Sequence, residues 1–501
     1  MSKRRFGSFA QVCALFLCGL PIVTRLGHLS TVISARNSHQ GEAQRTSPIS
    51  ETELPQSQLR WDRGYHKKAS QNILDDGNQE AEETVEIIRH EDSSDDRNPA
   101  LAPDFFAKAR TSIPPILNPH DMSLNRMACP AINDTRYSHL RPLKSEPDNR
   151  RKYLFTVSLQ QCINLLPSVL GPLIEVIRYL GPQNCALSIV LRNSTDGTLE
   201  ALRLLADELE RLDVGYWLSS TNLDPNAGPD DDRIRKLALL RTMALEPITG
   251  QHTELNDNNI IHHKSSNIRL APDTTIISLA TVAICAKDIL ELIHQHAHQS
   301  ADMVCAMDWW FPSPQHAHAQ FSSLWSSRAL DGNLFTEILL PSSQDCMKEK
   351  EEAEPDLLLL ASYPASHARL QAKLPFQVFA CHSSLAAYAA QPLADNRVSF
   401  RGPRDGECFQ GETQLFCKDM WRAGFGRIAV VPSVNVGCPS GDSGPDGGGR
   451  VKSVKGFVGD LVGGKEDEED RIVWQGEPPE RVVCMPGFGD QTWLAWDEGQ
   501  V

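Results

Sequence analysis

The chain has 501 residues, of which 41% are hydrophobic and 23% are charged, a composition typical of a globular protein with two or three structural units. Its net charge of -15 argues against an extended surface for phosphate backbones, so nucleic acid is excluded as a partner. Thirteen cysteines are too few for a disulfide scaffold, and no paired CxxC spacing indicates a structural zinc site.

Residues 1–28 are predicted to form a signal anchor. Basic residues at positions 3–5 precede an apolar run from 9 to 23, which is short for a membrane span and lacks a clean cleavage pattern. Such basic residues hold the N-terminus in the cytoplasm, so the rest of the chain is expected in the lumen of the Golgi or endoplasmic reticulum. A buried or disordered N-terminal stretch is the alternative. In the lumen, Asn133 of the Asn-Asp-Thr sequon is a predicted glycosylation site.

Residues 29–150 are predicted to form a polar, largely disordered stem. The stretch from 37 to 98 is poor in aromatic residues, and ten acidic residues face one arginine between positions 75 and 96. A segment with so much charge of one sign cannot bury enough apolar surface to fold.

From residue 151 the pattern changes to apolar runs of strand length that alternate with helical periods, which predicts an α/β domain over 151–438. Strands are predicted at 185–191, 274–279, 303–307, 376–380 and 427–431. Helices are predicted after residue 197, at 233–245 and at 286–294, with a loop at 251–267. Residues 439–501 are predicted to be a Gly-rich acidic linker and a short segment that docks through Trp493 and Trp496.

The first candidate site follows the strand at 185–191. Ser194 and Asp196 lie between this strand and the next helix, where ligands of open α/β sheets bind. Their hydroxyl and carboxylate could hold the base or ribose of a nucleotide. The alternative, which spacing alone favours, is that both side chains only cap the helix.

The second candidate site follows the strand at 303–307. Asp308 comes directly before Trp309 and Trp310. A carboxylate at this place could orient a sugar hydroxyl or bind a metal ion, and an indole could stack on a sugar or a base. The alternative is an aspartate that ends the strand and caps a turn.

The third candidate site combines Glu407, Glu412 and Asp419, which lie close to an apolar helical pattern. Paired carboxylates could perform acid/base chemistry or hold a divalent ion. A solvated helix face is the alternative, because acids at this spacing are common on helix surfaces.

Other catalytic signatures are missing from the sequence. The histidines at 262, 263, 294, 296, 298, 316 and 318 have no companions at zinc-ligand spacing, so they are predicted to be exposed loop and helix-end residues. No GxxxxGK, GxGxxG or GxSxG motif is present, which removes the main support for Walker-type ATPases, Rossmann dehydrogenases and α/β-hydrolases.

The order of several motifs resembles a known family. These are the strand-turn-helix at 188–198, the Arg-rich helix at 233–247, the Cys-Ala-Met-Asp-Trp strand end at 305–309, the turn at 325–333 and the segments at 407–421 and 426–436. Together they resemble the fungal alpha-1,3-mannosyltransferases of the cryptococcal capsule-associated group, glycosyltransferase family 69. The resemblance covers about residues 153–438.

The resemblance implies a GT-A-like nucleotide-sugar-binding domain with a central, mostly parallel sheet in a type II membrane protein. It implies mannosyl transfer from GDP-mannose, or another nucleotide sugar, to a hydroxyl of a glycan acceptor, commonly with Mn²⁺ or Mg²⁺. The donor-binding candidates are Ser194, Asp196, Arg241, Trp309 and Asp331. The catalytic candidates are Asp308, Glu407 and Glu412, and Asp308 is also the metal candidate.

The sequence departs from the family at one decisive place. Ala280-Thr281 stands where the family has an Asn-Asp pair, so no carboxylate follows the strand at 274–279. A catalytically impaired paralogue that binds glycan or a partner enzyme is therefore the alternative function. A secreted lectin-like adhesin would need all-β patterning, which this chain does not have.

Overall fold

Four parallel strands with almost fully buried side chains form one half of the central sheet. They are β1 (Tyr153–Gln160), β2 (Cys185–Arg192), β3 (Gly215–Thr221) and β5 (Thr275–Leu279). The sheet order around them is β3-β2-β1-β5, and each neighbouring pair is parallel. Strands buried on both faces read as continuous apolar runs, which explains why 185–191 and 274–279 are recognisable in the sequence.

The other half of the sheet mixes both strand directions. Its strands are β10 (Leu385–Ala389), β6 (Met303–Trp310), β11 (Ile428–Gly437), β9 (Phe376–Ala380) and β8 (Arg328–Ala329), in this order after β5. β10 is antiparallel to β5 and β6, whereas β6 and β11 are parallel. The short β4 (Ile261–Lys264) and β7 (Gln320–Phe321) pair with β3 and β6. The predicted α/β class with a central, mostly parallel sheet is confirmed.

The computed structural model describes only part of the chain: residues 102–121, 123–124, 127, 129–142, 150–228, 230–250, 261–264, 269–282, 284–310, 320–336, 359–382, 384–437, 470–487 and 490–499. The predicted signal anchor and most of the predicted stem lie outside these residues. No helix within the described ranges has both the length and the apolarity needed to cross a bilayer.

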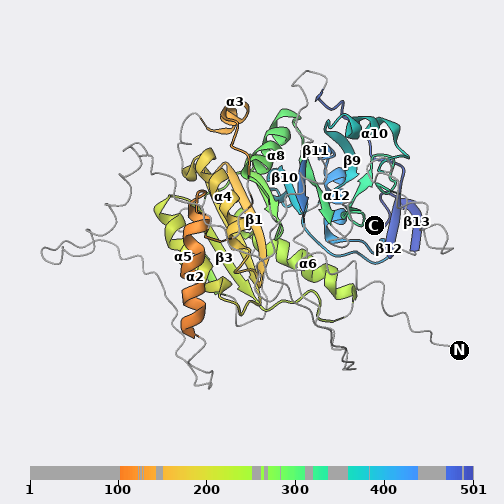
Figure 1. Ribbon diagram of the computed structural model, residues 1–501. Helices are drawn as coiled ribbons and strands as arrows, with labels where there is room; N and C mark the ends of the chain where they lie inside the picture. The colour runs from red at the N-terminus through yellow and green to blue at the C-terminus, as the bar shows by residue number, and fades with distance from the viewer. Residues whose placement is uncertain are drawn as a thin grey trace, which may run out of the picture. The chain divides into compact units, whose positions relative to one another are not determined.

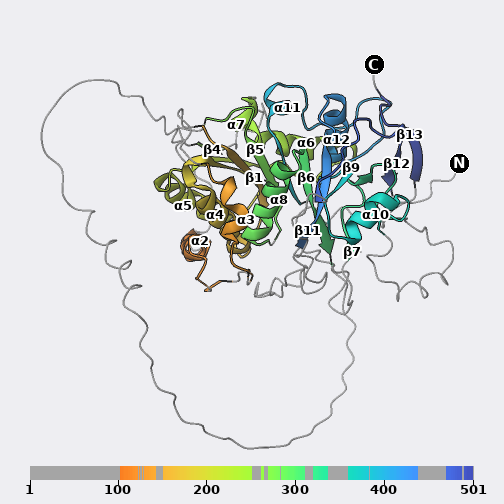
Figure 2. The ribbon, with the colours of Figure 1, turned by 90° about the horizontal axis from the view of Figure 1, so that it is seen from above.

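Helices cover both faces of the sheet. Figures 1 and 2 show α4 (Leu166–Leu180), α5 (Thr198–Arg211) and α8 (Ala286–His298) on one face, and α6 (Asp230–Ala244) and α12 (Glu412–Arg422) on the other. In α5 the buried side chains Leu202, Leu205 and Leu209 recur at helical spacing, as the sequence predicts. The shorter helices are α7 (Glu246–Thr249), α10 (Pro364–Gln371), α11 (Gln391–Ala394), η2 (Ser138–Leu140) and η3 (Pro182–Asn184).

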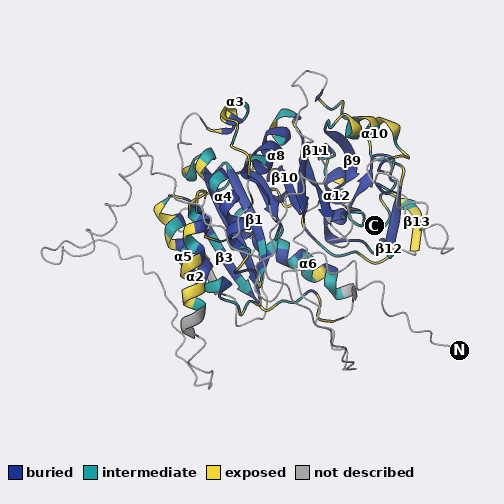
Figure 3. Cartoon of the chain, in the orientation of Figure 1, coloured by how far each residue is buried: buried dark blue, intermediate teal, exposed yellow. Residues whose placement is uncertain are grey.

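Strand alternation divides most of the core into two large clusters. In β1, Phe155, Val157 and Leu159 pack in the cluster that includes α4 and α8, whereas Leu154 packs in the cluster of the opposite face. Successive side chains of a strand point to opposite faces. Thr156 and Ser158 therefore share the α6 face with Leu154. Figure 3 shows the buried strands in the interior and exposed residues on outer helices such as α2 and α5.

The core extends into the predicted stem, and here the structure differs from the sequence-based expectation. α2 (Ala102–Leu117) packs on α4 and α5 and buries Ala109 and Ile116. The short α3 (Asp134–Tyr137) packs against α8, and a disulfide joins Cys129 to Cys285. The acidic stretch before residue 98 led to the prediction of disorder for the whole stem. The apolar residues between 102 and 117, which form α2, were not recognised as a helix.

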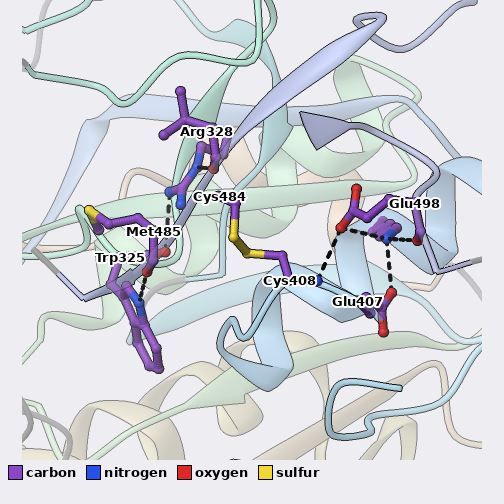
Figure 4. The surroundings of a disulfide bond; sticks show 9 residues. Trp325, Arg328, Glu407, Cys408, Cys484, Met485 and Glu498 are labelled. Carbon is purple, nitrogen blue, oxygen red and sulfur yellow. Dashed lines mark hydrogen bonds and ion pairs between the residues drawn. A yellow bond between two sulfur atoms is a disulfide. The ribbon is translucent and has the colours of Figure 1, made fainter. Parts of the chain in front are cut away.

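The C-terminal segment forms a hairpin of β12 (Arg481–Gly487) and β13 (Asp490–Ala495). The Cys408–Cys484 disulfide and a hydrogen bond from Arg328 Nε to the Val483 carbonyl, 2.7 Å long, attach it to the domain (Figure 4). Of the two tryptophans predicted to dock, Trp496 packs against the core, whereas Trp493 is 38% exposed. Residues 439–469 of the predicted linker lie outside the described residues.

Three local predictions are wrong. The strand predicted at 303–307 extends to Trp310, so Asp308 lies inside β6 opposite Val436 rather than after its end. Strand β4 occupies part of the predicted loop at 251–267. His294 is buried within α8 rather than exposed, because this helix packs against α3 and α4. The histidines at 316 and 318 lie outside the described residues.

Candidate active site

A cavity of about 70 Å³ lies where the direction of chain progression in the sheet reverses. From β1 the chain continues to β2 and β3 on one side, and it later returns to β5 on the other side of β1. In open α/β sheets ligands bind at the carboxyl ends of strands at such a switch point. The polar side chains that line the cavity are Thr156, Ser158, Arg192, Arg241, Ser278, Ser384 and Tyr388.

Arg192 is the buried charge of this cavity. It is the last residue of β2, and strand alternation directs it to the α6 face together with Val190, which packs on Leu240 and Met243 of α6. Only 4% of Arg192 is exposed, and its guanidinium makes no ion pair or hydrogen bond to any described residue. A buried charge without a partner costs several kcal/mol, so this side chain is set up for an anion.

Arg241 contributes a second guanidinium, but this one is already paired. Its Nε donates to Glu412 Oε1 over 2.8 Å, and its Cζ lies 5.4 Å from the centre of the Phe400 ring. Phe400 in turn stacks on Phe416 at 4.2 Å. The structure thus brings two predicted site residues together, and the Glu412 carboxylate balances the charge of Arg241.

Hydroxyl groups complete the wall of the cavity. Tyr388 is buried; its burial raises the pKa of its hydroxyl, and this effect exceeds the lowering by Arg241 and by a hydrogen bond with Ser278. Tyr388 is therefore neutral at ordinary pH. Thr281, which follows β5, donates from Oγ1 to the Ser158 carbonyl over 3.1 Å. Among the described residues, no carboxylate lines the cavity.

Asp308 lies behind this wall. Its Oδ2 accepts hydrogen bonds from Ser384 N and Ser384 Oγ, both at 2.8 Å, and from Ser323 Oγ at 3.0 Å. Asp308 is 4% exposed and does not line the cavity itself. It contacts Ser384, which does. The neighbouring Trp309 donates from Nε1 to Asn435 Oδ1 over 2.6 Å and is buried in the core.

Ser194 and Asp196 shape the turn that follows Arg192. Asp196 Oδ1 accepts from Thr198 N at 3.1 Å at the start of α5, and its Oδ2 accepts from Ile163 N at 2.9 Å. Ser194 Oγ donates to the Arg192 carbonyl over 2.6 Å. Neither residue lines the cavity. Asp196 holds the turn ahead of α5 and joins it to the loop after β1, while Gly197 is the N-cap residue of the helix.

Glu407 belongs to a separate cluster of charges near the C-terminal hairpin. It accepts from Arg401 Nη1 at 2.6 Å and from Lys418 Nζ at 2.9 Å, and Lys418 also contacts Glu498 (Figure 4). Burial alone would raise the pKa of the Glu407 carboxyl, and the hydrogen bonds from Arg401 and Lys418 outweigh burial and lower this pKa to about 2. Its oxygens are thus occupied. Asp331, the last predicted donor-binding residue, contacts Asn333 within its own turn.

Comparison with known proteins assigns the family. A family model described as "Cryptococcal mannosyltransferase 1" matches residues 152–419, more than half of the chain. The chain belongs to the cryptococcal mannosyltransferase 1 family. It is accordingly a glycosyltransferase. The matched range begins just before β1 and ends within α12, so it contains every polar residue of the cavity.

Individual relatives agree with the family. The alpha-1,3-mannosyltransferase CMT1 of Cryptococcus neoformans var. neoformans serotype D is 30% identical over 384 residues, 72% of this chain and 75% of that protein. Among solved structures, the mannosyltransferase PcManGT from Pyrobaculum calidifontis, in complex with GDP-Man and Mn²⁺, is 14% identical with a TM-score of 0.29 and covers 69% of each chain. S. aureus TarS 1-349 is 13% identical with a TM-score of 0.28, covering 57% of this chain and 60% of that one.

Of the seven polar residues that line the cavity, the sequence predicted only Arg241 as a site residue. The six that it missed include Arg192, Ser384 and Tyr388. Arg192 was counted as part of a turn, although a charged residue that directly ends an apolar run such as 185–191 is a usable signal. Ser384 and Tyr388 lie on or near β10, which was not predicted because Leu385–Ala389 is short and rich in alanine. The catalytic and donor-binding roles assigned from the resemblance stay predictions.

Proposed function

We propose that this protein transfers mannose from GDP-mannose to a hydroxyl of a glycan acceptor. The observation that supports this most is the cavity at the switch point, where the buried guanidinium of Arg192 has no counter-charge among the described residues. A sugar nucleotide carries its negative charge on its diphosphate. The 30% identity to an alpha-1,3-mannosyltransferase supports mannose as the sugar.

The chemistry of the transfer fits fixed positive charge at this place. The bond between the anomeric carbon and the diphosphate oxygen breaks, and its electron pair stays on that oxygen. The acceptor oxygen forms the new bond, and its proton passes to the departing diphosphate. Preorganised cations stabilise charge that develops on a leaving group. The cavity volume of about 70 Å³ is several times the roughly 10–15 Å³ that one water molecule requires, so it accommodates a phosphate-sized part of the donor.

The expected divalent cation does not fit the residues of this cavity. Mn²⁺ and Mg²⁺ prefer carboxylate oxygens, whereas the cavity presents hydroxyls and two guanidinium groups. Asp308, the metal candidate, already accepts three hydrogen bonds at Oδ2. Within the described ranges, no three His, Cys, Asp or Glu side chains gather as a metal site requires. No step of the proposed reaction is therefore assigned to a metal ion.

We place the reaction in the lumen of the secretory pathway. Three disulfides, Cys129–Cys285, Cys305–Cys381 and Cys408–Cys484, support this proposal because disulfides persist in oxidising compartments. Asn133 is exposed at the start of α3, where a glycosyltransferase of the secretory system can reach it. The predicted N-terminal anchor would supply the attachment to the membrane.

A catalytically impaired, glycan-binding or partner-binding paralogue is the second candidate function. It is favoured by Ala280-Thr281, where the family resemblance places an Asn-Asp pair. The test incubates the purified full chain with GDP-mannose and mannose-containing oligosaccharides, in EDTA and in Mn²⁺. Mass spectrometry then follows the added hexose, and UDP-glucose and UDP-N-acetylglucosamine serve as control donors. A product from GDP-mannose alone supports the proposal, whereas binding of GDP-mannose without any product supports the paralogue.

A further inference from the structure

We propose that Arg192 binds the diphosphate of the donor directly and that this protein therefore holds its nucleotide sugar without a divalent cation. The inference rests on the proposed function of the cavity as the donor site. It differs from the metal-bridged binding that the family resemblance implies, and it assigns to Arg192 the role that a metal ion would otherwise have.

The position of Arg192 is determined by the sheet. β1 and β2 are paired in parallel with Gln160 opposite Arg192, and the carboxyl end of β2 lies beside that of β1. The side chain leaves β2 on the α6 face, the same face that carries Ser158 and Thr156 of β1. Arg192 therefore projects into the cavity from a rigid strand rather than from a mobile loop, and such placement favours precise binding.

The charge balance of the cavity favours an anion. Glu412 neutralises Arg241 through the 2.8 Å ion pair, so Arg192 leaves the cavity with one uncompensated positive charge among the described residues. A divalent cation placed next to this guanidinium would be repelled, and the repulsion is strong where water is excluded. An anionic ligand, by contrast, removes the cost of burying Arg192.

The kind of anion follows from the shape of the donors. A guanidinium presents a planar fork of N–H groups that matches two phosphate oxygens, and such charge-assisted pairs are roughly twice as strong as neutral hydrogen bonds. The hydroxyls of Thr156 and Ser158 line the same cavity and can donate to further oxygens, whereas the Ser384 hydroxyl already donates to Asp308. A diphosphate offers enough oxygens for all of them, whereas a sugar carboxylate offers two.

Arg192 also has the energetic profile of a ligand-binding residue. A buried, unpaired charge destabilises a fold, and proteins retain such groups where function requires them. Replacement by the neutral Gln should therefore leave the melting temperature of the unliganded protein unchanged or higher. If Arg192 instead stabilised the fold, its replacement by Gln would lower the melting temperature.

The experiment measures binding of GDP and of inorganic pyrophosphate to the full chain by titration calorimetry in EDTA. We expect both to bind, with GDP affinity changed by less than about threefold when Mn²⁺ replaces EDTA. Arg192→Gln should weaken both ligands by about 30-fold or more, which is about 2 kcal/mol, because it removes one partner of a buried charge pair. Arg192→Lys should retain an intermediate affinity. Arg203→Gln, on the exposed surface of α5, is the matched control and should bind like the unaltered protein.

Several outcomes would overturn the inference. They are binding that requires Mn²⁺, equal affinity of Arg192→Gln and the unaltered protein, a melting temperature lowered by Arg192→Gln, and binding of glucuronate in place of pyrophosphate. A different outcome would contradict the proposed function and leave the inference about Arg192 intact. If pyrophosphate binds through Arg192 in EDTA but UDP is preferred over GDP, the direct phosphate site stands and only the GDP-mannose donor is wrong.

Discussion

Arg192 and Asp308 are both buried charges near the carboxyl ends of strands, but their surroundings differ. Asp308 receives three hydrogen bonds from Ser323 and Ser384, whereas Arg192 receives no counter-charge from a described residue. A carboxylate surrounded by donors holds those donors in place, so Asp308 is suited to fixing Ser384 in the cavity wall. An unbalanced guanidinium is suited to holding a ligand.

Asp308→Asn tests the role of that carboxylate. The amide keeps the shape, and its oxygen can still accept from Ser384, but the charge is lost and a buried NH₂ group is introduced. We expect at least a tenfold loss of transfer and a destabilisation of about 1–3 kcal/mol, the cost of an unsatisfied buried group. Transfer rates and urea denaturation measure the two effects. Full turnover of Asp308→Asn would limit Asp308 to a structural role.

Thr281→Asp tests the departure from the family. A carboxylate after β5, one residue beyond the cavity-lining Ala280, would give Arg192 an internal counter-charge and weaken GDP binding in EDTA by about tenfold, which is about 1.4 kcal/mol. It would also create an oxygen ligand, so Mn²⁺ should then restore binding. Thr281→Asn is the neutral control. An unaltered protein that is inactive, together with a Thr281→Asp variant that turns over with Mn²⁺, would establish the impaired paralogue instead.

At the scale of elements, α8 carries a buried polar cluster where it meets α3. Glu291 accepts from Arg136 Nε at 2.6 Å and from the Tyr137 hydroxyl at 2.9 Å, and His294 Nδ1 lies 3.1 Å from His139 Nε2. Burial lowers the pKa of His294 to about 4. This cluster fixes the segment that follows α2 to the domain, and it makes the contact sensitive to acid.

The stability of the protein should therefore fall as the pH decreases from about 6.5 to about 4. In this window the unfolded chain protonates His294, whose pKa is near 6.5 when unfolded, and the folded chain does not, so the unfolded state binds more protons. One such histidine contributes a slope of up to about 1.4 kcal/mol per pH unit. Urea denaturation at pH 6.5, 5.5 and 4.5 measures this slope, and His294→Gln should reduce it. An unchanged slope would contradict the assignment to His294.

A disulfide and several hydrogen bonds, among them one from a buried arginine, attach the C-terminal hairpin to the domain. Cys484 of β12 is joined to Cys408, which lies 76 residues earlier in the chain. Arg328, fully buried, donates to the carbonyls of Val483, Leu324 and Ser327. These contacts make the hairpin part of the folded domain although most of β13 is exposed.

Cys484→Ser should destabilise the folded state by about 2–4 kcal/mol, the usual contribution of a disulfide. The loss should be measurable as a lower denaturation midpoint, and limited proteolysis should then cleave first within 470–499. Cys417→Ser, at a buried cysteine outside the disulfides, is the control for loss of a sulfur atom and should leave proteolysis of the hairpin unchanged. Equal protection of the hairpin in Cys484→Ser would show that the non-covalent contacts, such as those of Arg328 and Trp325, are sufficient to hold it.

At the scale of the whole molecule, the net charge of -15 is unevenly distributed. Ten acidic residues fall between 75 and 96, whereas the cavity at the switch point carries the unbalanced charge of Arg192. The like charges of an acidic segment repel other anions. The local charge of the cavity, rather than the net charge, then determines which ligand binds.

Asn133 provides the test of compartment. Its Oδ1 accepts from Arg136 N at 3.3 Å to cap α3, and a glycan attaches through the amide nitrogen, so glycosylation and capping are compatible. We expect expression in a eukaryotic secretory system to yield a species that glycosidase shifts to lower mass. Asn133→Gln should remove this shift and leave transfer activity unchanged. A protein that is never modified at Asn133 would argue against the lumenal proposal.

The sequence by itself determined the α/β class, most of the buried strands and the family, because these depend on local patterns. Apolar runs such as 185–191 and the leucines of α5 are visible without knowing which strand lies next to which. The turn at Asp196 is equally local, since its contact with Thr198 spans two residues.

Only the tertiary structure decided which charges are paired. Arg241 and Glu412 lie 171 residues apart in the chain and form an ion pair, and Cys129 and Cys285 are separated by 156. No spacing rule predicts such partners. Arg192 could be recognised as a site residue only in the structure, for the same reason. It has no counter-charge among the described residues, and this is visible only when the elements around β2 are in place. Electrostatic balance depends on distances in space, whereas sequence patterns report only distances along the chain.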